Sequence, residues 1–168
     1  MSLQDRIRAD IAAAMRGGDT LRRDVLRLAS SAAYNVEKQQ GHPLTDDEYL
    51  AVLTREVKTR RESVEAFQAG GRDDLVAKES AEIAILSEYL PAPLTETELQ
   101  ALVDEAIRTT GAASARDLGK VMGWLSPRTR GRADGRHISE LVAAALTRVD
   151  LASHDAADPA GSARAAGG

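Results

Sequence analysis

The chain of 168 residues is acidic, with a formal net charge of -4 and a calculated isoelectric point near 5.4. It has no cysteine, which excludes disulfides, thiolate metal sites and a cysteine nucleophile and fits a reducing compartment. No apolar run approaches the roughly 20 residues that a membrane span requires, and the N-terminus alternates charged and apolar residues, unlike a secretory signal. We therefore expect a soluble cytoplasmic protein without a membrane partner.

The composition favours helices over strands. Hydrophobic residues make up 43% of the chain, and many of them are alanine, while leucine, glutamate and arginine are also frequent. These residues stabilise helices, whereas aromatic residues, which are typical of strands, account for only 3%. The sequence therefore predicts an all-α fold.

Apolar residues recur at helical spacing in four segments of the first half of the chain, at about residues 2–17, 20–40, 45–69 and 73–90. Ser2 with Asp5, and Thr45 with Glu48, have the spacing of a capping box at a helix start. Glycines follow the first three segments, where helices commonly stop. We expect these helices to form a four-helix, bundle-like N-terminal domain, residues 1–90.

The sequence Leu90-Pro91-Ala92-Pro93-Leu94 cannot continue a helix, and it predicts a hinge between two domains. Three further helices are expected, from Thr95 to Gly111, from Ser114 to a break at Ser126-Pro127, and from Asp134 to Val149. They form a small three-helix domain, residues 94–149. Residues 150–168 contain almost no large apolar side chain, so a disordered tail is expected there.

A search for catalytic or metal-binding residues finds no complete set. His42, His137 and His154 lack the spacing of a recognised metal motif, and the pair of His137 with Glu140 is typical of surface electrostatics. Serines such as Ser63 lie within predicted helices, without the glycine-flanked turn that exposes a nucleophile. We therefore predict no catalytic residue, no metal and no cofactor.

A basic loop is the strongest candidate for a binding site. Residues 116–137 hold six cations and two carboxylates, a local net charge of +4 in an acidic protein. Arginines alternate with small residues there, and the start of the last helix would add amide groups that attract phosphate. The predicted nucleic-acid-binding residues are Lys120, Arg128, Arg130, Arg132 and Arg136. Simple solvation of surface charge is the alternative interpretation.

Two other features have competing interpretations. Trp124 lies one turn before the basic loop, where it could stack on a ligand or pack in the core. A second group of cations lies in the third predicted helix, but glutamates at i, i+4 spacing favour mutual neutralisation over ligand binding. The expected pairs are Glu56 with Arg60, Lys58 with Glu62, and Arg61 with Glu65.

Several motifs occur in order along the chain: REVKTRRESVEAFQAGGRDDL from Arg55 to Leu75, then Glu82, Tyr89-Leu90-Pro91, Gly119-Lys120-Val121-Met122-Gly123 and Gly131-Arg132-Ala133-Asp134-Gly135. Together they cover about residues 3–148 and resemble the YqeY-like proteins of the GatB/YqeY family. These proteins are similar to the tail region of the B subunit of the amidotransferase that converts misacylated Glu-tRNA(Gln) or Asp-tRNA(Asn) to the amidated form.

The resemblance implies an all-helical fold with a larger N-terminal bundle and a small three-helix, GatB-tail-like domain. It implies tRNA as a partner, because the tail holds tRNA while transamidation takes place in other domains, and it suggests amidotransferase or synthetase proteins as further partners. The basic positions that it carries over are Lys120, Arg132 and the adjacent Arg136. Leu118 replaces an expected methionine, a volume-conserving change.

Three hypotheses follow. The first is a tRNA- or RNA-binding accessory protein, and the second is a protein-interaction module that docks on an acidic partner. The third is an amidotransferase component, since the resemblance implies an association with carbon–nitrogen ligase activity that uses glutamine as the amide donor. The residues supply no nucleophile for the third, so we expect no catalysis by the chain alone.

Overall fold

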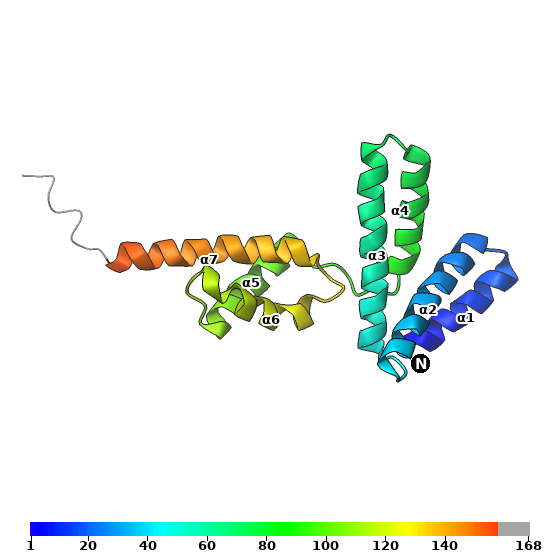
Figure 1. Cartoon of the computed structure of the whole chain (residues 1–168), viewed down its shortest axis with the longest axis horizontal. Helices are drawn as coiled ribbons and strands as arrows, with labels where there is room; N and C mark the ends of the chain where they lie inside the picture. Colours follow the sequence, from blue (N-terminus) through cyan, green and yellow to red (C-terminus); the bar gives the residue numbers. More distant parts are fainter. Residues whose placement is uncertain (158–168) are drawn as a thin grey trace, which may run out of the picture. The chain divides into compact units, whose positions relative to one another are not determined.

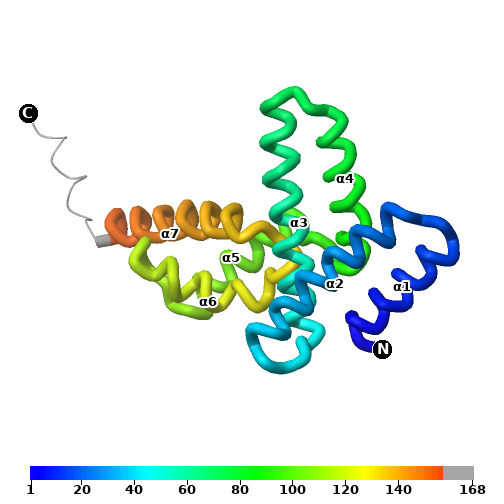
Figure 2. Tube along the Cα trace, turned by 45° about the vertical axis from the view of Figure 1, so that its right-hand side comes forward, coloured from blue at the N-terminus to red at the C-terminus, as the bar shows by residue number. Residues whose placement is uncertain are grey.

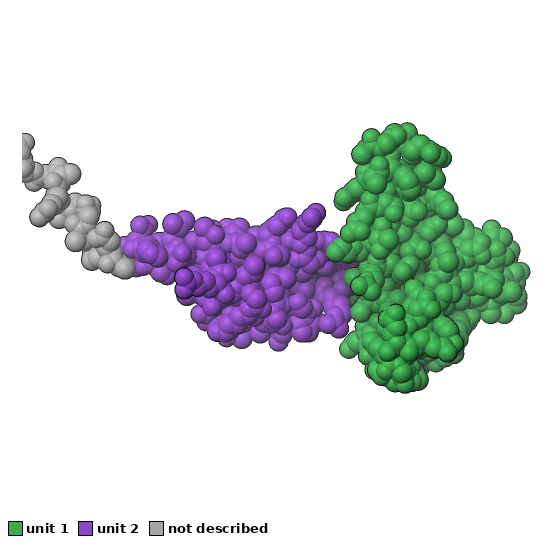
Figure 3. Space-filling view, viewed as in Figure 1, with its two compact units in different colours: residues 1–92 green, residues 93–168 purple. Residues whose placement is uncertain are grey.

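The computed structural model describes residues 1–157, and this part contains seven α-helices, one 3-10 turn and no strand. The predicted all-α fold is confirmed. The chain divides into two compact units, which Figure 3 shows in different colours: unit 1, Met1–Ala92, and unit 2, which begins at Pro93. Each unit has its own hydrophobic core.

Unit 1 consists of two helical hairpins. The first is formed by α1 (Leu3–Gly17) and α2 (Thr20–Gln40), and the second by α3 (Asp46–Ala69) and α4 (Asp73–Ser87). The two helices of each hairpin lie side by side in both Figure 1 and Figure 2. All four helices contribute to one core, whose fully buried side chains include Ile7, Leu26, Leu53 and Leu86.

The helices of unit 1 begin where their capping residues lie. The predicted capping boxes at Ser2 and Thr45 are both present, and the Asp19 side chain accepts a hydrogen bond at the start of α2. Such caps satisfy amide groups that have no partner within the helix. The chain then turns at glycines in the left-handed conformation, such as Gly18 and Gly41.

An ion pair inside unit 1 joins α3 to α4. The Nε of Arg60 donates to Glu82 at 2.9 Å, and its Nη1 donates to Glu56 at 2.8 Å. Arg60 and Glu82 are each only 8% exposed. Burial opposes the charge of Arg60, but the hydrogen bonds that it donates to Glu56 and Glu82 raise its pKa. The guanidinium therefore stays charged within the hairpin.

Unit 2 consists of α5 (Glu96–Thr110), the 3-10 turn η1 (Ala115–Asp117), α6 (Leu118–Thr129) and α7 (Gly135–Ala157). The three shorter elements all pack against α7, and Figures 1 and 2 show α5 and α6 beside it. Their apolar faces meet in a core whose fully buried side chains include Val103, Val121, Leu125, Val142 and Leu146. This core positions the loop between α6 and α7.

The predicted break at Ser126-Pro127 is wrong, because α6 continues through Pro127 to Thr129. Proline removes one amide donor and normally disrupts a helix. The missing amide would donate to the carbonyl of Gly123, four residues earlier. The hydroxyls of Ser126 and Thr129 donate to other carbonyls of the helix end, those of Met122 and Leu125. Pro127 lies in the last turn of α6 with its ring exposed, where the loss of one hydrogen bond leaves the rest of the helix in place.

The prediction of a disordered tail from residue 150 is wrong for residues 150–157, which form the end of α7. This segment lacks large buried side chains, but it contains no glycine or proline and includes three alanines, which have high helix propensity. The hydroxyl of Ser153 also donates to the carbonyl of Val149. Residues 158–168, the rest of the predicted tail, lie outside the described residues.

Within residues 1–157, no helix combines the length and the apolar character needed to cross a membrane.

Candidate nucleic-acid interface

The loop between α6 and α7 is held by its own backbone. Gly131 adopts φ +72°, a left-handed conformation that disfavours residues with a side chain. The carbonyl of Thr129 accepts hydrogen bonds from the amides of Arg132 and Ala133, at 2.9 and 3.2 Å. The carbonyl of Arg132 in turn accepts the amide of Leu94 at 2.8 Å. These bonds fix the loop to the start of unit 2.

The predicted cations occupy three adjoining elements. Lys120 lies on α6, Arg128 in its last turn, Arg130 and Arg132 in the loop, and Arg136 in the first turn of α7. Arg132 is half-buried, and the other four are exposed. We call these five residues the basic surface.

Three members of the basic surface carry charge that no carboxylate neutralises directly. Lys120, Arg130 and Arg136 form no ion pair within 4 Å in the described part of the chain. Two members of the surface have a carboxylate neighbour. Hydrogen bonds from Ala113 and Ser114, with a smaller effect of the Lys120 charge, lower the pKa of Asp117. Hydrogen bonds from Thr95, with a smaller effect of the Arg132 charge, lower the pKa of Glu98. The surface keeps the positive charge that phosphate binding requires.

Arg128 stacks on Trp124. Its guanidinium carbon lies 3.8 Å from the centroid of the indole ring, and its Nη1 donates to the Trp124 carbonyl at 2.7 Å. Trp124 is half-buried and packs against the unit 2 core, so core packing is its first role. A cation–π contact of this kind is worth about 0.5–1 kcal/mol at an exposed site.

The start of α7 does not offer the free amides that the sequence suggested. The side chain of Asp134 accepts hydrogen bonds from the amides of Arg136 and His137, at 2.8 and 3.2 Å. The Asp134 carbonyl accepts a third, from Ile138. The carboxylate thus caps the helix, and phosphate attraction at this point depends on side-chain charge.

His137 belongs to an ion pair, not to a metal-ligand pair with Glu140. Its Nε2 lies 3.0 Å from a carboxylate oxygen of Glu96, at the start of α5. The hydrogen bond to Glu96 is the largest of the effects that raise the pKa of His137. Among the described residues, no group of three or more potential ligands is placed to hold a metal ion.

The second group of cations differs from the prediction. Of the three expected i, i+4 pairs, only Glu56 with Arg60 is present, and Arg60 is buried in the hairpin of α3 and α4. Lys58 and Arg61 are exposed and form no ion pair with any residue that the structure describes. The buried arginine therefore stabilises unit 1 and is not available to a ligand.

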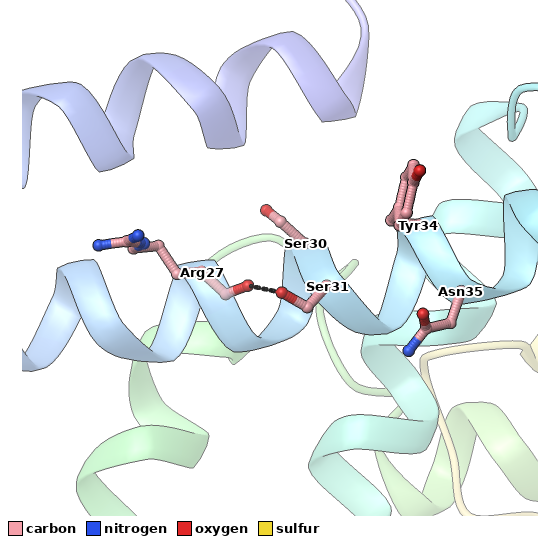
Figure 4. A pocket seen from close by; sticks show the side chains of 5 residues that line it. All are labelled: Arg27, Ser30, Ser31, Tyr34 and Asn35. Carbon is pink, nitrogen blue, oxygen red and sulfur yellow. Dashed lines mark hydrogen bonds between the residues drawn. The ribbon is translucent and has the colours of Figure 1, made fainter.

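The serines within helices are engaged in local hydrogen bonds. Figure 4 shows a shallow pocket on α2, in which Ser31 donates to the carbonyl of Arg27 at 3.0 Å. The side chains that line it, including those of Tyr34 and Asn35, point in different directions and do not converge on one position. Ser63 likewise donates to the carbonyl of Thr59. These hydroxyls occupy the positions typical of helix back-bonding.

Two features of the interface were missed in the sequence although their signals are present. Trp124 and Arg128 are four residues apart, the spacing at which helical side chains meet. The start of the last helix at Asp134 was predicted, but not that the Asp134 carboxylate would occupy the amides of Arg136 and His137, although aspartate is a common N-cap residue. The pair of Glu96 with His137 has no local signal, because 41 residues separate the two side chains.

Comparison with known proteins identifies the family. The family described as Yqey-like protein matches residues 4–146. A relative from Pyrenophora tritici-repentis, named altered inheritance of mitochondria protein 41, mitochondrial, is 28% identical over 141 residues, which are 82% of this chain and 77% of the relative. Relatives of the same name are 27% identical in Lachancea thermotolerans, over 84% of this chain and 78% of theirs, and 27% identical in Saccharomyces cerevisiae, over 70% and 66%. The chain therefore belongs to the YqeY-like family.

Proposed function

We propose that unit 2 binds the phosphate backbone of structured RNA, with tRNA as the first candidate, through the basic surface. The observation that carries this proposal is the exposed charge of Lys120, Arg130 and Arg136, which lacks ion-pair partners among the described residues of an acidic protein. Folding would more commonly place carboxylates beside such a cluster, because like charges repel. A polyanionic partner supplies the missing negative charge.

The physics of phosphate binding sets the strength of this interaction. Each neutralised phosphate releases counterions, so the logarithm of affinity falls with the logarithm of salt concentration at about -0.7 to -0.9 per contact. Five contacts predict a slope of about -3.5 to -4.5 and an affinity in the micromolar range or weaker. Such contacts position RNA without reading its sequence.

The resemblance to the tail of the amidotransferase B subunit supports tRNA over other RNA. By that analogy the protein is an accessory factor that holds tRNA for an amidotransferase or a synthetase, and the ligase chemistry belongs to those partners. The relatives compared above are by name mitochondrial proteins. A cytoplasmic location therefore remains a prediction for this chain.

The proposal is tested by tRNA binding at several salt concentrations. The variant Arg130→Gln/Arg136→Gln removes two charges from the basic surface, and the matched control Arg108→Gln/Arg148→Gln removes two exposed charges elsewhere on unit 2. The first should weaken binding at least about 10-fold and reduce the slope by about 1.4–1.8, with little effect from the control. Equal affinities of both variants and the wild type would exclude the basic surface as the binding site.

A protein partner is the second candidate, and a feature of unit 1 favours it. The helix α2 exposes Leu21, Leu28 and Tyr34, at 41%, 59% and 54%. Large apolar side chains that gather on one element can mark a protein interface. Co-purification of a partner that survives nuclease treatment, and is lost in Leu28→Ser, would support this candidate. Loss of the partner on nuclease treatment would support RNA binding instead.

A further inference from the structure

The stack of Arg128 on Trp124 has a geometry that points beyond simple phosphate binding. An edge-on guanidinium would bring a nitrogen over the ring and keep its central carbon further away. At 3.8 Å from that carbon to the ring centroid, the guanidinium is in van der Waals contact with the face of the ring, the separation of a stacked pair. The hydrogen bond from Nη1 to the Trp124 carbonyl fixes the guanidinium in this position.

The side chain of Arg128 remains accessible to solvent while it contacts the indole. Arg128 is exposed, and its contacts with the described residues are those with Trp124 on the same helix. The indole itself is anchored, since Trp124 is half-buried against the unit 2 core. A planar cation held against a fixed aromatic ring presents a flat surface to solvent. RNA bases stack on surfaces of this kind, both on aromatic rings and on arginine planes.

We infer that the pair Trp124–Arg128 is a stacking platform for an unpaired nucleobase, so that the preferred ligand is RNA with a single-stranded loop or end. The inference rests on the proposed function, because the neighbouring cations would hold the phosphates on either side of the stacked base. A base inside a continuous duplex is already stacked between its neighbours and cannot reach the platform. Duplex RNA would therefore use the charges alone.

The fluorescence of Trp124 provides the test, because this is the only tryptophan in the chain. The full-length protein is titrated with a short unstructured RNA, with the duplex of the same sequence, and with a hairpin that has an unpaired loop. The unpaired RNAs should quench the fluorescence and bind more tightly than the duplex. The duplex should bind without comparable quenching.

Two charge-conserving variants separate stacking from charge. Arg128→Lys keeps the cation but loses the plane, and Arg130→Lys is the matched control on the same surface. Loss of one stacked base predicts about a 5- to 100-fold weaker affinity for unpaired RNA in Arg128→Lys, with the duplex affinity and the salt slope unchanged. Arg130→Lys should leave the ratio of single-strand to duplex affinity at its wild-type value.

The outcomes distinguish the platform from the proposed function. Equal affinity for duplex and unpaired RNA, unaffected by Arg128→Lys, would overturn the platform and leave phosphate binding intact. Absence of binding to any of the RNAs would overturn both. Quenching that persists unchanged in Arg128→Lys, with unchanged affinity, would also contradict a role for the guanidinium plane.

Discussion

Replacing Arg60 with methionine removes one partner of an ion pair that solvent barely reaches. In the native chain Arg60 bridges Glu82 on α4 and Glu56 on its own helix, at 2.9 and 2.8 Å. The buried side-chain polar atoms of the described residues all have hydrogen-bond partners, so this site is fully satisfied in the native chain. Methionine has a similar length and is apolar, so the change removes the charge and the hydrogen bonds but fills most of the space.

The burial of the ion pair decides how much the substitution lowers the free energy of unfolding. An exposed ion pair contributes at most about 1 kcal/mol, but Arg60 and Glu82 are each 8% exposed, so the remaining carboxylate would stay desolvated. Breaking a buried pair by removing one partner costs about 3–5 kcal/mol, a large part of the roughly 5–15 kcal/mol that stabilises a domain. The double variant Arg60→Met/Glu82→Leu removes both charges, and it should recover most of this loss.

Urea denaturation of the full chain, followed by far-UV circular dichroism, measures the change. Trp124 fluorescence reports unit 2 in the same samples, because unit 1 has no tryptophan. Arg61→Met is the matched control, since Arg61 is exposed, and it should change the free energy of unfolding by less than about 0.5 kcal/mol. A cost below about 1 kcal/mol for Arg60→Met, or a double variant as unstable as the sum of the single ones, would refute the reasoning.

Three further predictions concern unit 2. Asp134→Ala removes the cap from the amide of Arg136 and should destabilise unit 2 by about 0.5–2 kcal/mol in urea denaturation. The same change removes a negative charge next to the basic surface, so it should strengthen tRNA binding, and weaker binding at low salt would contradict this. Gly123→Ala should stabilise unit 2 by about 0.5–1 kcal/mol, because alanine favours a helix and its Cβ would meet no atom within 4 Å. Gly131→Ala should destabilise unit 2 by about 1–2 kcal/mol, because a side chain disfavours φ +72°. Effects of the opposite signs in thermal unfolding would contradict this reasoning. Because the hydrogen bond to Glu96 raises the pKa of His137, the contribution of this pair to stability is present below the ordinary histidine pKa of about 6.5 and is lost as pH rises through the raised value. Glu96→Gln should remove this fall of Tm above about pH 6.5, and identical pH profiles of Tm would argue against the pair.

The helix starts could be predicted because their causes are local. The capping boxes at Ser2, Thr45 and Thr95 each involve residues three apart, and all three are formed. The two errors in the helix boundaries came from applying local rules without their context. Pro127 lies in the last turn of α6 with its ring exposed, so its missing amide removes one hydrogen bond at the helix end. Residues 150–157 are helical because helix propensity does not require burial.

The basic surface was predictable as a set of residues but not as a geometry. Alternating arginines near a helix start are visible in the sequence, and the structure places them on adjoining elements. Their individual roles depend on neighbours. Arg128 lies on an indole, Arg132 lies half-buried near Glu98, and the amides beside Arg136 are occupied by Asp134.

By itself, the sequence of this protein determined its helices, its all-α class and its family, because capping, helical periodicity and motif order are properties of neighbouring residues. Only the tertiary structure decided which charges are available. Arg60 and Glu82 are 22 residues apart, and their mutual burial withdraws one cation from solvent, while Arg130 has no carboxylate beside it among the described residues. The free energy of a charge depends on the groups that surround it in space, and residues distant in the chain supply most of those groups.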